Sequence, residues 1–232
     1  MNEQIPYTNS LASIQIASNP EPRCACALVL DISGSMSGDA IAELNEAVQC
    51  LINDLAAEAL ASKRVEISVV TFGESVELVS DFTSPRQLVI PKLEAGGGTP
   101  MGEAVVKAAS VLEARKEEYK RAGLQYFRPW MFLITDGEPT DEDSAYWREA
   151  VRIVHDGDSK GRLLFFGVAV GGANQVRLDQ LCPPKRPSQK LRGLRFREMF
   201  LWLTRTLTSV SSLNPGQTVQ LPSTNGWSQI DA

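Results

Sequence analysis

Residues 24–35 read Cys-Ala-Cys-Ala-Leu-Val-Leu-Asp-Ile-Ser-Gly-Ser and give the strongest indication of how the chain folds. The first seven form a continuous apolar run, which is typical of a strand buried on both faces of a parallel sheet. Polar residues follow at the point where that strand ends, namely Asp31, Ser33 and Ser35. The stretch therefore predicts a central strand with oxygen-bearing side chains at its carboxyl end.

Four other segments predict strands. Residues 130–135 and 163–170 are apolar runs like the first, so we expect them to be buried strands. At 65–69, valine and isoleucine alternate with polar residues, which predicts a half-exposed strand. The segment 76–79 follows a Gly-Glu turn, and we expect it to pair with that strand in antiparallel fashion at an edge of the sheet.

Apolar residues spaced three and four apart predict helices between these strands. We expect them at 41–59, at 100–121, after a cap at Asp141, at 175–181 and along an apolar stripe from Phe196 to Val210. Pro100 is favoured at a first helical position, and we expect Thr99 to cap that helix. The alternation predicts a doubly wound α/β fold, with a mostly parallel central sheet, one antiparallel edge strand and helices on both faces.

The composition is that of a soluble globular chain, with 43% hydrophobic and 22% charged residues among 232. We expect an N-terminal extension at 1–22, one domain at 23–212 and an extended C-terminal tail at 213–232. The net charge of −5 argues against nucleic acid or an anionic membrane as the partner. In contrast to this negative net charge, the stretch from Lys185 to Arg197 is rich in basic residues. It is either a solvated face or a docking patch for an acidic partner.

No apolar run approaches the roughly 20 residues that cross a bilayer, and residues 1–23 lack the basic and apolar parts of a signal sequence. The four cysteines show neither the spacing of a zinc site nor that of a disulfide framework. Cys24 and Cys26 could together hold a soft metal, although we expect them to be small buried strand residues. These observations predict a cytoplasmic protein.

Five oxygen-bearing side chains lie on three loops next to predicted strands and helices. Asp31, Ser33 and Ser35 follow the first strand, Thr99 precedes a predicted helix, and Asp136 follows another strand. Ligands of a doubly wound sheet bind at the carboxyl ends of its strands, so we expect these side chains to meet there. An all-oxygen set suits a hard cation, Mg²⁺ or Mn²⁺ with Ca²⁺ as a further candidate, and is a poor zinc site.

Each of these residues also has a plainer interpretation. Ser33 and Ser35 could belong to a loop that caps the next helix, and Thr99 could be a helix cap only. Asp136 could belong to a simple turn. The acidic residues within 138–143 could bind a second cation, or they could lie at a solvated helix start.

The DxSxS run, followed by a distant Thr and a distant Asp, resembles the metal-ion-dependent adhesion site of von Willebrand factor A domains. The resemblance implies that Ser33 and Ser35 bind the metal directly and that Thr99 binds it in the partner-bound state. It also implies that Asp31 and Asp136 act mostly through water. A carboxylate from a partner protein would then complete the coordination of the ion.

Three further stretches resemble the TerY-like branch of this family, which is linked to bacterial tellurite resistance. They are GGTPMG at 97–102, TDGEPTD at 135–141 and LRGL at 191–194. That branch is associated with a protein kinase and a PP2C-type phosphatase in stress-response or phage-defence gene sets. The resemblance implies a kinase, a phosphatase or both as partners.

Two other functions compete with a protein-binding adaptor. One is a Mg²⁺-dependent phosphohydrolase of the haloacid dehalogenase type, but such enzymes need a second Asp where Ser33 stands. The loop at 96–99 lacks the Lys of a phosphate-binding loop, and the single histidine, His155, falls on a predicted helix away from the strand ends. The other is an extracellular adhesin, which the missing signal sequence argues against. We therefore expect a protein that is not an enzyme.

Overall fold

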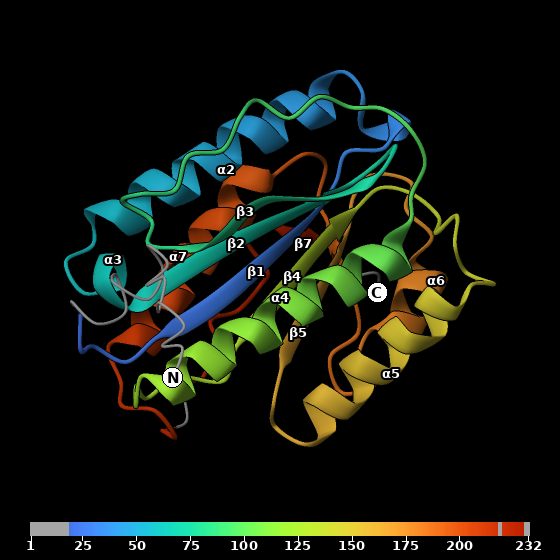
Figure 1. Ribbon diagram of the computed structural model, residues 1–232. Coiled ribbons are helices and arrows are strands. Elements are labelled where there is room, and N and C mark those ends of the chain that lie inside the picture. Colours follow the sequence, from blue (N-terminus) through green and yellow to red (C-terminus); the bar gives the residue numbers. More distant parts are fainter. Residues whose placement is uncertain (1–18, 218–219, 230–232) are drawn as a thin grey trace, which may run out of the picture.

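The computed structural model describes residues 19–217 and 220–229, and these form a seven-stranded sheet in the order β3-β2-β1-β4-β5-β6-β7 (Figure 1). The strands are β1 (Cys24–Asp31), β2 (Val65–Phe72), β3 (Val76–Thr83), β4 (Trp130–Thr135), β5 (Leu164–Ala169), β6 (Gln189–Leu191) and β7 (Ser228–Gln229). The five inner strands, β2, β1, β4, β5 and β6, pair in parallel. At the two edges, β3 pairs antiparallel with β2 and β7 pairs antiparallel with β6. The predicted fold class is confirmed, including the antiparallel edge at 76–79. Most of the predicted N-terminal extension, 1–18, lies outside the described residues.

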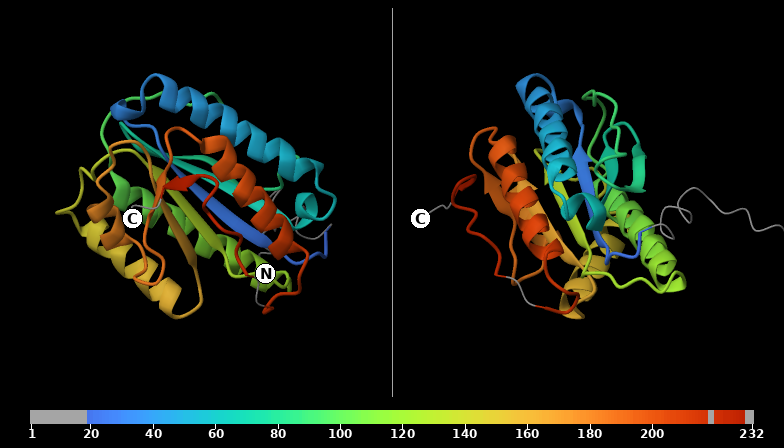
Figure 2. Two further views of the ribbon diagram at one scale, coloured as in Figure 1. Left: turned by 180° about the vertical axis from the view of Figure 1, so that it is seen from behind. Right: turned by 90° about the vertical axis from the view of Figure 1, so that its left-hand side faces the viewer.

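Helices cover both faces of the sheet, as predicted. They are α2 (Asp39–Ala57), α3 (Ala61–Arg64), α4 (Met101–Arg121), α5 (Ala145–Ser159), α6 (Gln175–Leu181) and α7 (Phe196–Ser211), with a short 3₁₀ turn, η1 (Gly34–Met36). One hydrophobic core joins α2 and α7 to the sheet, and a second joins α4, α5 and α6 to its other face. Figure 2 shows the sheet between these two layers.

The central strand β1 contributes to both cores, which explains its unbroken apolar run. Leu28 and Leu30 pack into the core under α2 and α7, whereas Ala27 and Val29 pack into the core under α4 and α5. All four are fully buried. Complete burial of a Leu or Val side chain stabilises a fold by about 1.5–3 kcal/mol, so a polar residue in this strand would be costly.

The prediction of a half-exposed strand at 65–69 is wrong, because every residue of β2 is buried. Glu66 is only 7% exposed and forms ion pairs with Arg23 at 3.2 Å and Arg115 at 2.8 Å. The hydroxyl of Tyr119 also donates a hydrogen bond to Glu66. A buried carboxylate is tolerated when its charge is paired and its oxygens are hydrogen-bonded, so a polar alternation does not always mark a solvent-facing strand.

Two short strands lie where the sequence predicts no element. β6 follows the proline-rich loop, and β7 belongs to the tail at 213–232, where Lys190 pairs with Gln229 and Leu191 with Ser228. The tail also buries Trp227 against Trp202 of α7, with ring centroids 5.7 Å apart. Strands of two and three residues are too short for a periodic signal, because their pairing partners determine where they form.

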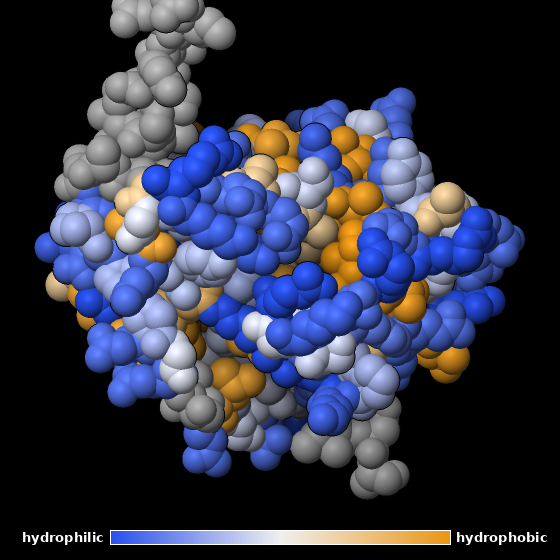
Figure 3. Space-filling model, turned by 60° about the horizontal axis from the view of Figure 1, so that its bottom comes forward, coloured by the Kyte–Doolittle hydropathy of each residue, from blue (hydrophilic) through white to orange (hydrophobic). Residues whose placement is uncertain are grey.

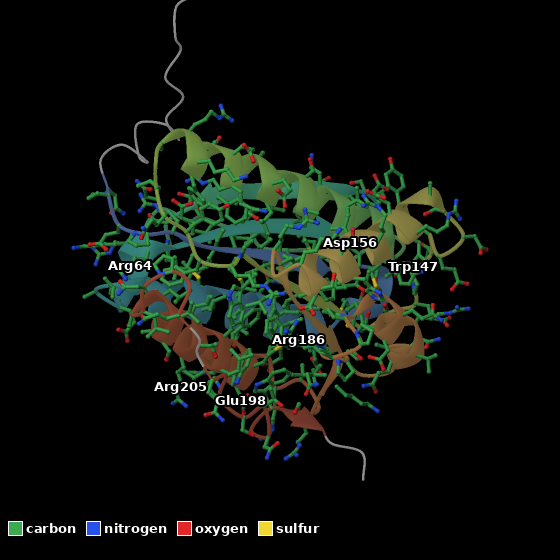
Figure 4. All side chains as sticks on the ribbon, turned by 90° about the horizontal axis from the view of Figure 1, so that it is seen from below. Arg64, Trp147, Asp156, Arg186, Glu198 and Arg205 are labelled. Atoms are coloured by element: carbon green, nitrogen blue, oxygen red, sulfur yellow. The ribbon has the colours of Figure 1, made fainter. Side chains whose placement is uncertain are left out.

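One face of the molecule is mostly polar. Figure 3 shows hydrophilic side chains over most of one face, with smaller hydrophobic patches between them. None of the described helices has both the length and the apolar character needed to cross a bilayer. The short helix α3 lies beside the end of α7. Arg64, the last residue of α3 (Figure 4), donates hydrogen bonds to the carbonyls of Ser211 at 2.7 Å and Leu213 at 3.1 Å.

Candidate metal centre

Four of the five predicted site residues form one hydrogen-bonded network at the carboxyl ends of β1 and β4. The backbone N–H of Ser33 donates to Asp31 Oδ1 at 2.7 Å. The hydroxyls of Ser33 and Ser35 lie 3.0 Å apart, and the Ser35 hydroxyl donates to Asp136 Oδ1 at 2.7 Å. The turn after β1 therefore brings the two carboxylates and two hydroxyls together, as the sequence predicts.

The fifth residue, Thr99, lies beside this network. A Cβ atom placed on Gly137 would be 2.9 Å from Thr99 Oγ1 and 3.7 Å from Asp31 Oδ2, so both oxygens border the same point. Thr99 is 5% exposed, and its hydroxyl makes no hydrogen bond to another described residue. A hydroxyl in that position is available as a ligand.

Thr99 does not cap α4, and that prediction is wrong. The helix begins at Met101, and the carboxylate of Asp141 accepts hydrogen bonds from the N–H groups of Gly102 at 3.1 Å and Glu103 at 2.9 Å. Asp141 therefore caps α4 and not the next helix, α5, which is capped by Ser144. Capping by a residue about 40 positions away leaves no local sequence signal.

The loop before α4 is held against the β1 turn by its backbone. Gly34 N–H donates to Gly97 O at 3.0 Å, and Gly96 N–H donates to Ile32 O at 2.7 Å. Gly97 has a φ of 76°, and a Cβ there would collide with the backbone of Glu74. Only glycine fits that conformation and that close approach, so the glycine run fixes where Thr99 lies.

Two threonines that the sequence does not single out support the site. The Thr135 hydroxyl donates to Asp31 Oδ2 at 2.6 Å, which occupies the second carboxylate oxygen. The Thr99 backbone exchanges two hydrogen bonds with Thr140, one from Thr99 N–H to the Thr140 hydroxyl at 3.2 Å and one from Thr140 N–H to the Thr99 carbonyl at 2.9 Å. Both threonines lie in the 135–141 stretch, but a hydroxyl that orients a ligand looks like any other loop Thr in a sequence.

The electrostatics of the site suit a cation. Asp31 is fully buried, and burial raises its pKa, with a further increase from the charge of Asp136. Hydrogen bonds from Ser33 and Thr135 oppose this increase, and no described Lys or Arg stabilises the Asp31 carboxylate. A buried carboxylate without a positive partner is costly, and a bound cation would remove that cost.

The donor chemistry fits a hard ion better than zinc. Within residues 19–217 and 220–229, no three His, Cys, Asp or Glu side chains are grouped as metal ligands. The site instead combines two carboxylates with the hydroxyls of Ser33, Ser35 and Thr99, the oxygen set that Mg²⁺ and Mn²⁺ prefer. Cys24 and Cys26 are fully buried in β1, and burial raises the pKa of the Cys24 thiol to about 12, which does not favour a thiolate metal ligand.

Three of the four acidic residues within 138–143 are already engaged, and the fourth, Asp143, is exposed. Besides Asp141, Glu142 forms an ion pair with Arg177 of α6 at 2.9 Å, and Glu138 accepts a hydrogen bond from Asn174 at 2.5 Å. Of the two interpretations of this run, negative charge at a helix start fits the contacts, although the helix that benefits is α4. His155 lies on α5, with Nε2 3.0 Å from the carbonyl of Cys182, and not among the site residues.

Comparison with known proteins identifies the family and the fold of the chain. The model of the von Willebrand factor type A domain family matches residues 26–192. Human inter-alpha-trypsin inhibitor heavy chain H6 is 29% identical over 115 residues, which cover 48% of this chain and 9% of that protein. Heavy chain H4 from Sus scrofa is 30% identical over 151 residues, which cover 61% of this chain and 15% of that protein. The chain thus spans only a small part of the curated relatives that it matches.

Solved structures share the fold at low identity. The pilus adhesin SpaC from Lactobacillus rhamnosus GG superposes with a TM-score of 0.64 at 12% identity and covers 83% of this chain and 31% of its own. The ArnB paralog VWA2 from Sulfolobus acidocaldarius gives 0.51 at 18% identity, covering 81% and 44%. BatB from Bacteroides thetaiotaomicron gives 0.54 at 14% identity, covering 82% and 98%.

Proposed function

The chain belongs to the von Willebrand factor type A domain family, and from that premise we propose that it is a Mg²⁺-dependent protein-binding module without enzymatic activity. Domains of this family generally serve protein interaction or adhesion. The observation that carries the proposal is the fully buried Asp31, which has no positive partner among the described residues and lies in one network with Ser33, Ser35 and Asp136.

Each side chain has a role in this proposal. Ser33 and Ser35 hold the ion through their hydroxyls, while Asp31 and Asp136 supply the negative charge and orient those hydroxyls. Mg²⁺ supplies a strongly electrophilic position that a carboxylate of a partner protein fills. The free hydroxyl of Thr99 becomes a ligand when the partner is bound.

The composition of the site supports a binding role. No described histidine or cysteine lies in the network of Asp31, Ser33, Ser35 and Asp136. A serine nucleophile is usually activated by a histidine or another base that is itself oriented by a third group. The Ser35 hydroxyl instead contacts the Ser33 hydroxyl and the carboxylate of Asp136, which in this proposal hold the ion.

We extend the proposal to the cellular role. The stretches at 97–102 and 135–141 build the site, and they are also the stretches that resemble the TerY-like branch. On that resemblance, the module acts in the cytoplasm in a tellurite-resistance or related stress response. Its partners there are a protein kinase, a PP2C-type phosphatase or both.

Affinity capture from the native host tests the proposal. Wild type in Mg²⁺ should retain a partner, identified by mass spectrometry, that EDTA releases and that Asp31→Asn fails to retain. Thr99→Ala should weaken the partner more than the metal, on the order of 1–3 kcal/mol for one lost charge-assisted contact. Asp143→Asn removes an exposed carboxylate from the same loop and serves as the control. Equal capture of the partner in EDTA and by Asp31→Asn would contradict a metal-dependent role.

A further inference from the structure

Three exposed arginines form a basic strip at the start of α7, in a chain whose net charge is −5. We define the basic strip as Arg192, Arg195 and Arg197. Arg195 lies 4.0 Å from Glu198, at the limit of an ion pair, and Arg192 and Arg197 form no ion pair within the described chain. Uncompensated exposed cations of this kind attract anionic groups from solution.

The C-terminal tail anchors two arginines of the basic strip, Arg192 and Arg195. The backbone N–H of Arg192 donates to the carbonyl of Trp227 at 2.8 Å, and its guanidinium lies 3.4 Å from the carbonyl of Ser228. The Arg195 guanidinium donates to the carbonyl of Gly226 at 3.3 Å. A guanidinium has five N–H donors, so each of these side chains keeps donors for a carboxylate after it is anchored.

The strand register places the basic strip at the same edge as the metal centre. Leu30 of β1 pairs with Ile134 of β4, Ile134 with Val168 of β5, and Val168 with Gln189 of β6. Asp31 ends β1, and Asp136 and Arg192 directly follow β4 and β6, so all three lie at the carboxyl edge of the sheet. Two to three strand spacings of about 4.8 Å separate the strip from the metal centre, roughly 10–15 Å in total.

Two exposed glycines lie between the two sites. Gly171 and Gly172 follow β5, which lies between β4 and β6. A Cβ placed on Gly172 would meet nothing within 4 Å. Next to them, Asn174 donates a hydrogen bond to Glu138 of the loop after β4. The two glycines themselves present no side chain to a peptide that crosses them.

We propose that this edge docks an extended acidic segment of a partner protein at two points. One carboxylate of the segment binds the metal ion, and further carboxylates bind the basic strip after the segment crosses Gly171 and Gly172. An extended chain rises about 3.3 Å per residue, so the second acidic position lies roughly three to five residues from the first. Arginine suits this role because its planar guanidinium binds a carboxylate through two parallel hydrogen bonds. The inference rests on the proposed function and specifies the partner of that site.

The test uses a fluorescein-labelled deca-glutamate peptide, titrated with the full chain in Mg²⁺ and in EDTA. Wild type should bind it in Mg²⁺, and Arg192→Gln/Arg195→Gln/Arg197→Gln should weaken binding about tenfold, since three surface contacts are lost. Gly172→Trp should weaken it severalfold by blocking the path. That position has no left-handed φ, so the fold tolerates a side chain there. Mg²⁺ affinity should be unchanged in both variants.

A charge-matched variant at the opposite edge is the control. Lys120→Gln/Arg121→Gln/Arg162→Gln removes three positive charges from exposed positions at the end of α4 and before β5, and it should bind deca-glutamate like wild type. The proposal is overturned if wild type does not bind the peptide, or if either the strip variant or Gly172→Trp binds it as wild type does. Mg²⁺-dependent binding without a strip effect refutes only this inference. Binding that ignores EDTA and Asp31→Asn refutes the proposed function itself.

Discussion

Gly137 sets how closely Thr99 and Asp31 approach each other. It follows Asp136, and its missing side chain leaves the space that borders both Thr99 Oγ1 and Asp31 Oδ2. Gly34, between Ser33 and Ser35, is different, because a Cβ there would meet only the carbonyl of Gly97 at an ordinary 3.6 Å. A methyl side chain therefore fits at Gly34 but not at Gly137.

Gly137→Ala should displace Thr99, because the new methyl group would lie 2.9 Å from its hydroxyl. We expect partner affinity to fall at least tenfold and the free energy of unfolding to fall by about 1–3 kcal/mol, as for other overpacked sites. Gly34→Ala, the matched control, should bind the partner and unfold like wild type. Calorimetry and urea denaturation measure both quantities. Wild-type partner binding by Gly137→Ala would show that this spacing does not matter.

The sequence identifies the residues of the site but not their supports. Asp31, Ser33, Ser35 and Asp136 are recognisable because each directly follows an apolar strand, and strand ends meet at one edge. The role of Thr135 depends on which way its hydroxyl points within the folded sheet. Orientation of that kind is set by tertiary packing and has no counterpart in residue spacing.

At the scale of elements, α4 depends on a distant loop for its start. Its first N–H groups, like those of any helix, lack partners within the helix, and the carboxylate of Asp141 receives two of them. This contact joins the β4–α5 loop, which carries Asp136, to the helix that follows Thr99. The geometry of the metal centre and the capping of α4 are therefore coupled.

Asp141→Ala should lower the free energy of unfolding by about 1 kcal/mol, the usual effect of losing a helix cap. Because the loop that carries Asp136 loses its anchor, Mg²⁺ affinity should fall as well. Asp143→Ala, on the same loop and exposed, should leave both quantities unchanged. Chemical denaturation and metal titration of the two variants measure the effects. Equal stability of Asp141→Ala and Asp143→Ala would rule out the capping role.

In the molecule as a whole, the carboxyl and amino ends of the parallel strands carry different kinds of residues. The carboxyl edge carries the candidate metal centre and the basic strip, whereas Glu66, Arg23 and Arg115 form a buried ion-pair network at the amino edge. Burial and the charge of Glu66 raise the pKa of Tyr119 in that network well above its usual range, which keeps its hydroxyl protonated. Binding residues can therefore vary at one edge while the other maintains the fold.

Buried thiols should make the fold sensitive to alkali. Burial raises the pKa of Cys24 and of Cys182 from 9.0 to about 12. The folded chain therefore keeps protons that the unfolded chain releases, so the free energy of unfolding should fall as the pH rises from 9 towards 12. Cys24→Ala/Cys182→Ala should show a shallower decline when denaturation midpoints are compared at pH 8 and pH 10.5. An unchanged slope would mean that these thiols ionise alike in both states.

Most of the fold could be predicted from the sequence because long elements carry a strong periodic pattern. The strand at 130–135 and the helix at 175–181 were predicted to the residue. The exposure of β2 was predicted wrongly because its residue Glu66 is buried, where it forms ion pairs with Arg23 and Arg115 from distant segments of the chain. β6 and β7 were missed because each exists only through its neighbour in the sheet.

We propose that the network of Asp31, Ser33, Ser35 and Asp136, with Thr99 beside it, holds a divalent ion. Crystals grown in Mn²⁺ and measured at the manganese absorption edge test it most directly. We expect one anomalous peak next to the hydroxyls of Ser33 and Ser35, and no such peak in crystals of Asp31→Asn. A wild-type crystal in saturating Mn²⁺ with no peak at these hydroxyls, or with peaks only elsewhere, would contradict it.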